Sequence, residues 1–107
     1  MQVYKVVFSD LARCDLFDIK TYLLDVAGER VAQHVEKGIL SEAKKLRIFP
    51  SGYPKDFYAS SDNLTVRFII KWRYKILFVI DEEKFEVQVV GIFHTAQNPD
   101  KMEKYGL

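Results

Sequence analysis

Residues 64–93 read LTVRFIIKWRYKILFVIDEEKFEVQVVGIF and hold three apolar runs with short polar breaks between them. The runs cover residues 64–72, 74–80 and 85–93, and each is rich in the β-branched and aromatic side chains typical of strands. Arg73 separates the first two runs, and the polar sequence DEEK separates the last two. Connections this short join antiparallel neighbours, so the stretch predicts a three-stranded meander.

One further strand and two helices are predicted before the meander. Residues 2–8 (QVYKVVF) are rich in strand-forming side chains and predict the first strand. Ser9 is a typical N-cap residue, so we expect a helix from there to Gly28, which can adopt the positive φ of a helix end. A second helix is expected from about Glu29, and Gly38 within it indicates close packing against a neighbour or a kink.

The apolar spacing of the two helices predicts one buried face on each. The expected buried positions are Ala12, Leu16, Ile19, Leu23 and Val26 in the first helix, and Ala32, Val35, Ile39, Ala43 and Leu46 in the second. Asp15 is expected on the exposed surface of the first helix. The order β-α-α-β-β-β predicts an α+β fold, with a helical hairpin packed on one face of a twisted, mainly antiparallel sheet. We expect residues 1–107 to form a single domain.

The composition excludes several classes of protein. The chain has 107 residues, of which 49% are hydrophobic and 29% are charged, as in a globular domain and unlike a disordered chain. The single cysteine, Cys14, cannot form an internal disulfide, which favours a reducing compartment. The longest apolar run, residues 76–80, is too short to span a membrane, and the first residues lack a secretory pattern. We therefore expect a cytoplasmic domain with no membrane partner.

Basic residues are concentrated in the middle of a chain whose formal net charge is only +1. Residues 44–75 hold 8 basic and 2 acidic side chains, so this block is a candidate anion-binding surface. At its start, Lys44, Lys45 and Arg47 are expected only to complement the C-terminal dipole of the second helix.

The strand alternation predicts one core face and one half-polar face of the sheet. The polar side chains expected together on the face that the helices leave open are Arg67, Lys71, Lys75, Gln88 and His94. Metal-free cleavage of RNA needs groups that accept and donate a proton, and cations near the phosphate. His94 is suited to proton transfer near neutral pH, and the cations of this face and Arg73 are suited to phosphate. The aromatic candidates for stacking on unpaired bases are Tyr53, Phe57, Tyr58 and Tyr74, although packing is the commoner use of such residues.

The sequence lacks the patterns that hold a metal or a cofactor. His34 and His94 lie far apart, there is one cysteine, and no HExxH, GxGxxG or P-loop pattern occurs. We therefore predict no metal site and no cofactor, and we assign no role to His34.

Five stretches, taken in order, resemble the RelE/ParE family of toxins from bacterial type II toxin–antitoxin systems. They are YKVVFSDLARCDLFDIKTYL at 4–23, GERVAQHVEKGI at 28–39, LRIFPSGYP at 46–54, RYKILF at 73–78 and IFHTAQNP at 92–99. The resemblance covers almost the whole chain and implies the same β-α-α-β-β-β fold. It also implies a growth-inhibiting toxin that a cognate antitoxin neutralises, with promoter DNA bound only through the antitoxin complex.

The family has two branches, and they imply different targets. One branch cleaves messenger RNA on the ribosome, and the other poisons DNA gyrase without cleaving RNA. The near-neutral charge favours the gyrase branch, because ribosome-acting members tend to be strongly basic. The alternatives are a ribosome-dependent ribonuclease and a non-toxic homologue that retains only antitoxin binding.

The resemblance, together with the cations already named for phosphate binding, implies roles for individual residues. The catalytic candidates, should the chain be a ribonuclease, are Arg67, Lys75 and His94, and the candidates for binding the target or a phosphate are Lys71, Arg73 and Gln97. Lys75 stands where the family usually has Arg, which keeps the charge but loses the bidentate geometry. Gln97 stands where many ParE-like chains carry Arg, so a cation is missing there.

Overall fold

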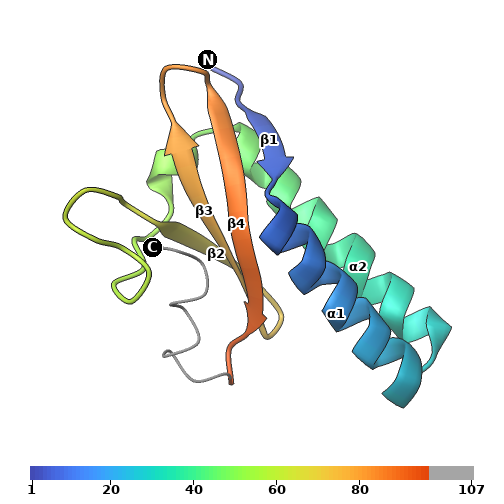
Figure 1. Cartoon of the computed structure of the whole chain (residues 1–107). Coiled ribbons are helices and arrows are strands. Elements are labelled where there is room, and N and C mark those ends of the chain that lie inside the picture. The colour runs from blue at the N-terminus through green and yellow to red at the C-terminus, as the bar shows by residue number, and fades with distance from the viewer. Residues whose placement is uncertain (97–107) are drawn as a thin grey trace.

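The computed structural model describes residues 1–96 of the chain, and the predicted β-α-α-β-β-β order is confirmed within them (Figure 1). The elements are β1 (Lys5–Phe8), α1 (Asp10–Val26), α2 (Glu29–Lys44), β2 (Arg67–Lys71), β3 (Tyr74–Asp81) and β4 (Glu86–His94), with short 3-10 helices at Lys45–Arg47 and Pro50–Gly52. The sheet order is β1-β4-β3-β2. β1 runs parallel to β4, and the other neighbours are antiparallel, so the mainly antiparallel sheet is confirmed too.

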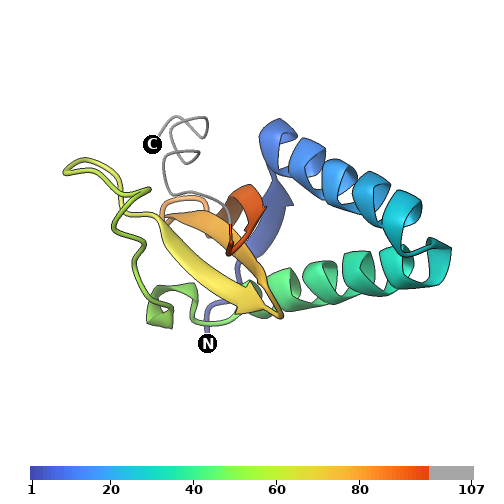
Figure 2. The same cartoon turned by 90° about the horizontal axis from the view of Figure 1, so that it is seen from below.

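The two helices form the predicted hairpin on one side of the sheet (Figure 2). The Ser9 hydroxyl accepts a hydrogen bond from the Ala12 N–H at 3.1 Å and caps α1, which satisfies one of the free donors at a helix start. Gly28 separates the helices with φ 93°, a conformation that glycine adopts without strain. None of the helices in the described part of the chain has the length and apolar character needed to cross a bilayer.

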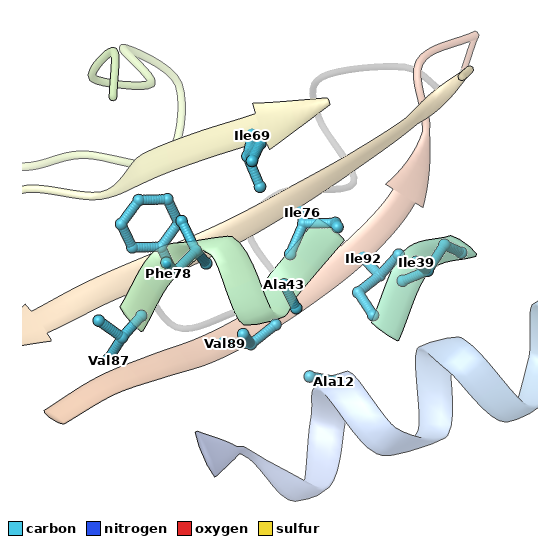
Figure 3. Packing of buried hydrophobic residues seen from close by; sticks show 10 residues of the cluster. Ala12, Ile39, Ala43, Ile69, Ile76, Phe78, Val87, Val89 and Ile92 are labelled. Carbon is cyan, nitrogen blue, oxygen red and sulfur yellow. The ribbon is translucent and has the colours of Figure 1, made fainter. Parts of the chain in front are cut away.

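The main core lies between the helical hairpin and the sheet (Figure 3). Its buried members are Ala12, Ile39, Ala43, Leu46, Ile69, Ile76, Phe78, Val87, Val89 and Ile92. The face predicted for α2 is confirmed, since Ala32 also lies buried. In α1, however, Val26 is exposed, because the far end of the hairpin extends beyond the sheet (Figure 1).

Two predictions are wrong where α1 meets β4. Leu77 pairs with Gly91 and Phe78 pairs with Val89, so Val90 is an extra residue in β4. Strict alternation along residues 85–93 would place Phe93 on the same face as Val89. A one-residue bulge reverses the alternation beyond it, so Val89 lies in the main core and Phe93 lies on the opposite face. Asp15, expected on the surface, is buried, and its carboxylate accepts a hydrogen bond from the Ile92 N–H at 3.0 Å. The carboxylate therefore fixes α1 against β4 at the bulge.

The expected single basic face is also wrong. Arg67 lies opposite Phe78, and Lys71 lies opposite Tyr74, so both cations project on the helix-covered face at the two ends of β2. Long cationic side chains can lie along apolar surface there while their charged ends reach water. Lys75 pairs with Ile70 and Phe93 and lies on the opposite face.

That opposite face has a smaller apolar cluster of its own. It is formed by Ala59, Val66, Leu77 and Phe93, with Leu11, Phe68, Val79 and Val90 packed against it. Gln88 pairs with Val79 and therefore shares this face with Lys75, away from Arg67. β2 carries apolar side chains on both faces, so its alternation alone does not tell which face the helices cover.

Candidate functional site

Arg67 joins the loop after α2 to the sheet. Its Nη1 donates a hydrogen bond to the Tyr53 carbonyl oxygen at 2.7 Å. The Tyr53 ring packs edge-on against Phe78, with centroids 6.1 Å apart. One guanidinium nitrogen of Arg67 is thus committed to holding the loop, and the side chain is only half-exposed.

Lys75 belongs to a buried ion pair. Its Nζ lies 2.9 Å from Oδ2 of Asp56 and 4.3 Å from the centroid of the Phe68 ring. Asp56 is only 3% exposed. A carboxylate this buried needs a charged or hydrogen-bonding partner, so the Lys75 ammonium supports the loop that carries Asp56.

A second group of candidates meets at the end of the sheet beside the β2–β3 turn. Lys71, Tyr74 and His94 lie directly across from one another on three adjacent strands. The Tyr74 and His94 rings form an edge-to-face contact, with centroids 5.5 Å apart. His94 Nδ1 accepts a hydrogen bond from the Ala96 N–H at 3.1 Å, which places the proton of the neutral imidazole on Nε2. Burial raises the pKa of the Tyr74 phenol, and the nearby Tyr22 adds to this rise.

The turn itself places a tryptophan on α2. Trp72 has φ 54°, and its indole lies directly over Gly38, where a Cβ would overlap the ring. The His34 ring packs on the indole with centroids 5.1 Å apart, and the Lys71 Nζ lies 4.7 Å from its centroid. Gly38 had indicated close packing or a kink, and close packing is what the structure has. No sequence pattern indicated that Trp72 would be the neighbour of Gly38.

The remaining candidates lie near the same turn or outside the described residues. Arg73 is exposed, and its carbonyl oxygen accepts a hydrogen bond from the Thr95 N–H at 2.7 Å. This bond holds the end of β4 against the turn. Lys71 also lies 3.9 Å from Glu42. Gln97 falls outside the described residues.

The arrangement separates the three residues expected to act together in RNA cleavage. Lys75 lies on the opposite face from Arg67 and His94. Lys71 is the residue of β2 that aligns with His94, through Tyr74. Arg67 lies four residues from Lys71 along β2, a distance of about 13 Å at the usual strand spacing, so Arg67 is also distant from His94. Within residues 1–96 the side chains also form no group of three or more acids, histidines or cysteines able to hold a metal.

Comparison with known families identifies the chain. A sequence model described as the ParE toxin of the type II toxin–antitoxin system parDE matches residues 6–99. The chain belongs to this toxin family. The range matched to the ParE toxins contains all the candidate residues from Arg67 to Gln97. No protein of curated function matches the sequence significantly.

Two solved toxin–antitoxin structures share the fold of this ParE-family chain. The chromosomal ParDE system from P. aeruginosa matches with a TM-score of 0.68 and 15% identity, over 86% of this chain and 96% of the other. The toxin–antitoxin complex RelBE2 from Mycobacterium tuberculosis matches with a TM-score of 0.67 and 20% identity, over 91% of this chain and 97% of the other. Both confirm two helices packed on an open, mixed, four-stranded sheet, and neither distinguishes the two activities.

Proposed function

We propose that this ParE-family protein inhibits growth by binding a protein target, DNA gyrase, and that it cleaves no RNA. The observation that carries the proposal is the separation of Arg67, Lys75 and His94. Cleavage of a phosphodiester needs a proton acceptor, a proton donor and cations within hydrogen-bond reach of the same phosphate. Lys75 faces away from His94 and is paired with Asp56, so this set does not surround one phosphate.

The charge distribution supports the same proposal. Lys75 pairs with Asp56, while Lys45 and Lys71 both lie near Glu42. Pairing lowers the number of cations that a polyanion can use to release counterions. The central basic block therefore offers a ribosome or a messenger RNA less attraction than its sequence composition suggests.

The proposed regulatory partner is a cognate antitoxin. The similar structures are toxin–antitoxin systems, and their likeness to this chain supports such a partner. We propose that the antitoxin neutralises this chain in the cytoplasm and that promoter DNA is bound only by the joint complex.

The second candidate function is a ribosome-dependent ribonuclease of the RelE-like branch. It is favoured by the group at the β2–β3 turn, where His94 and Lys71 lie in line and Arg73 is exposed nearby. In that case His94 would transfer the proton, and Lys71 and Arg73 would bind the phosphate.

Expression of the chain alone in a bacterium separates these functions. We expect growth arrest, induction of a DNA-damage reporter and intact messenger RNA by primer extension. New messenger RNA ends that disappear with His94→Ala, while the antitoxin still binds, would replace the proposal with the ribonuclease. Unimpaired growth with a soluble, antitoxin-binding protein would identify a non-toxic homologue.

A further inference from the structure

Two adjacent aromatic side chains project from the loop between α2 and β2. Phe57 is 85% exposed and Tyr58 is 73% exposed, whereas their neighbours Asp56 and Ala59 are buried. In both overall views the loop extends from β2 away from the helical hairpin (Figures 1 and 2). Single exposed apolar residues are common, but two successive exposed aromatics indicate an interaction site.

Asp56 fixes the turn that carries the two rings. Its Oδ1 accepts hydrogen bonds from the N–H groups of Tyr58 at 3.0 Å and Ala59 at 2.9 Å. Its backbone oxygen accepts the Ser60 N–H at 3.1 Å, so residues 56–60 form one closed turn. Because the other carboxylate oxygen binds Lys75 at 2.9 Å, the turn is joined to the middle of the sheet.

Both ends of the turn are also held by β2 and the residue before it. The Asp56 N–H donates to the Val66 oxygen at 2.7 Å, and the Phe68 N–H donates to the Pro54 oxygen at 3.0 Å. The Ser60 hydroxyl accepts from the Val66 N–H and donates to the Val66 oxygen. With Ala59 buried in the second apolar cluster, Phe57 and Tyr58 stand outward on a rigid support.

Rigid presentation lowers the entropy that a partner must overcome on binding. Aromatic side chains that fill a pocket are the commonest energetic centres of protein interfaces. Two side chains that project from a loop fit a pocket on a folded partner. A partner segment that folds on binding would instead need a groove on this protein.

The charge around the pair specifies the partner further. Within residues 53–60 the charged side chains are Lys55 and Asp56, and Asp56 is paired with Lys75. Lys55 is exposed and favours an acidic rim around the pocket. One cation beside two rings is too little for a nucleic acid, since such sites combine stacking with a strongly basic groove.

We propose that Phe57 and Tyr58 insert together into an apolar pocket with an acidic rim on the folded protein that this toxin targets. The inference rests on the proposed function and names the surface that performs it. Lys75 acts in it as a positioning residue, through Asp56, and not as a catalytic residue.

Purified protein and purified DNA gyrase test the proposal by a titration of binding affinity. Phe57→Ala with Tyr58→Ala should weaken binding by roughly 10- to 100-fold, the range expected when central aromatic anchors are lost. Phe17→Ala is the matched control, because Phe17 is an exposed aromatic residue on α1, and it should bind as the wild type does. Lys55→Glu should slow association and reduce its dependence on salt.

The outcomes separate this inference from the proposed function. Gyrase binding that the double variant retains in full overturns the inference and leaves the function standing. Absence of gyrase binding by the wild type overturns the gyrase target. The role of Phe57 and Tyr58 is then tested by whether the double variant still inhibits growth. If the double variant no longer arrests growth but binds the antitoxin normally, the docking pair is supported with another target. Three results overturn the proposed role of Phe57 and Tyr58. They are full growth arrest by the double variant, a loss of antitoxin affinity alone, and a change in self-association alone, measured by sedimentation.

Discussion

Replacing Gly38 with Ala should destabilise this protein, although the same change normally stabilises a helix. Ala is favoured over Gly in a helix interior by about 1 kcal/mol. At this position, however, the new Cβ would overlap the indole of Trp72. Either the Trp72 side chain remains under strain, or it moves away from α2 and loses its contacts there.

The size of the effect follows from the burial of the indole. Trp72 is 47% exposed, so roughly 100 Å² of its surface is covered, which corresponds to about 2.5 kcal/mol. Subtracting the helix gain of about 1 kcal/mol predicts a net loss of about 1–2 kcal/mol in the free energy of unfolding. The melting temperature should fall by roughly 5–10 °C.

Urea unfolding followed by circular dichroism measures this change, with the Trp72→Ala background as the control. In that background Gly38→Ala should stabilise the protein by about 1 kcal/mol, because only the helix preference remains. The sign of the substitution should thus reverse when Trp72 is removed. Stabilisation by Gly38→Ala in the presence of Trp72 would refute the packing of the indole on α2.

Three further predictions concern buried and half-buried polar groups. Lys75→Met should lower the free energy of unfolding by about 2–3 kcal/mol, since it leaves the buried Asp56 carboxylate without its cation. In urea titrations, Asp56→Asn should lower the free energy of unfolding less in the Lys75→Met background than in the wild type, and additive losses would contradict the pairing. Asp15→Ala should lower the free energy of unfolding by about 1–3 kcal/mol, because the Ile92 N–H loses its hydrogen-bond acceptor. Hydrogen exchange of the Ile92 amide should then become faster, whereas an exposed Asp15 would leave it unchanged. Because the folded-state pKa of Tyr74 is raised, its contribution to stability is complete below the unfolded pKa of about 10 and is lost as pH rises through the folded value. Tyr74→Phe should therefore flatten the fall of stability in alkaline urea titrations, and an unchanged fall would show that Tyr74 is not responsible.

Much of the fold could be predicted from local signals in the sequence. Ser9 and Gly28 set the limits of α1 because a hydroxyl cap and a positive φ are local requirements. The breaks at Arg73 and DEEK likewise fix the meander, because short connections force antiparallel neighbours. These features depend on residues close together in the chain.

The faces of the sheet could not be predicted in the same way. The bulge at Val90 decides on which face Ile92 and Phe93 lie. The neighbouring Gly91 is a local mark of a bulge, but the predicted alternation treated residues 85–93 as a regular strand. Asp15 is buried against the part of β4 beyond the bulge, where its carboxylate accepts the Ile92 N–H, and this contact joins residues far apart in the chain. Lys75 likewise appears as one more cation in the sequence, and only tertiary contact joins it to Asp56.

The candidate site was predicted less well than the fold for the same reason. The alternation predicts Arg67, Lys71, Lys75, Gln88 and His94 on one face, but the register aligns only Lys71 with His94, through Tyr74. Phe57 and Tyr58 were considered with Tyr53 and Tyr74 as one aromatic set, and burial divides them. Tyr53 and Tyr74 pack against the main core, whereas the other two are exposed.

The most direct test of non-catalytic toxicity is pulse labelling after induction of this chain alone in a bacterium, with DNA and protein synthesis followed separately. The account predicts that DNA synthesis fails first while messenger RNA stays intact. An immediate collapse of protein synthesis, before any change in DNA synthesis, would contradict it and favour ribonuclease chemistry at His94.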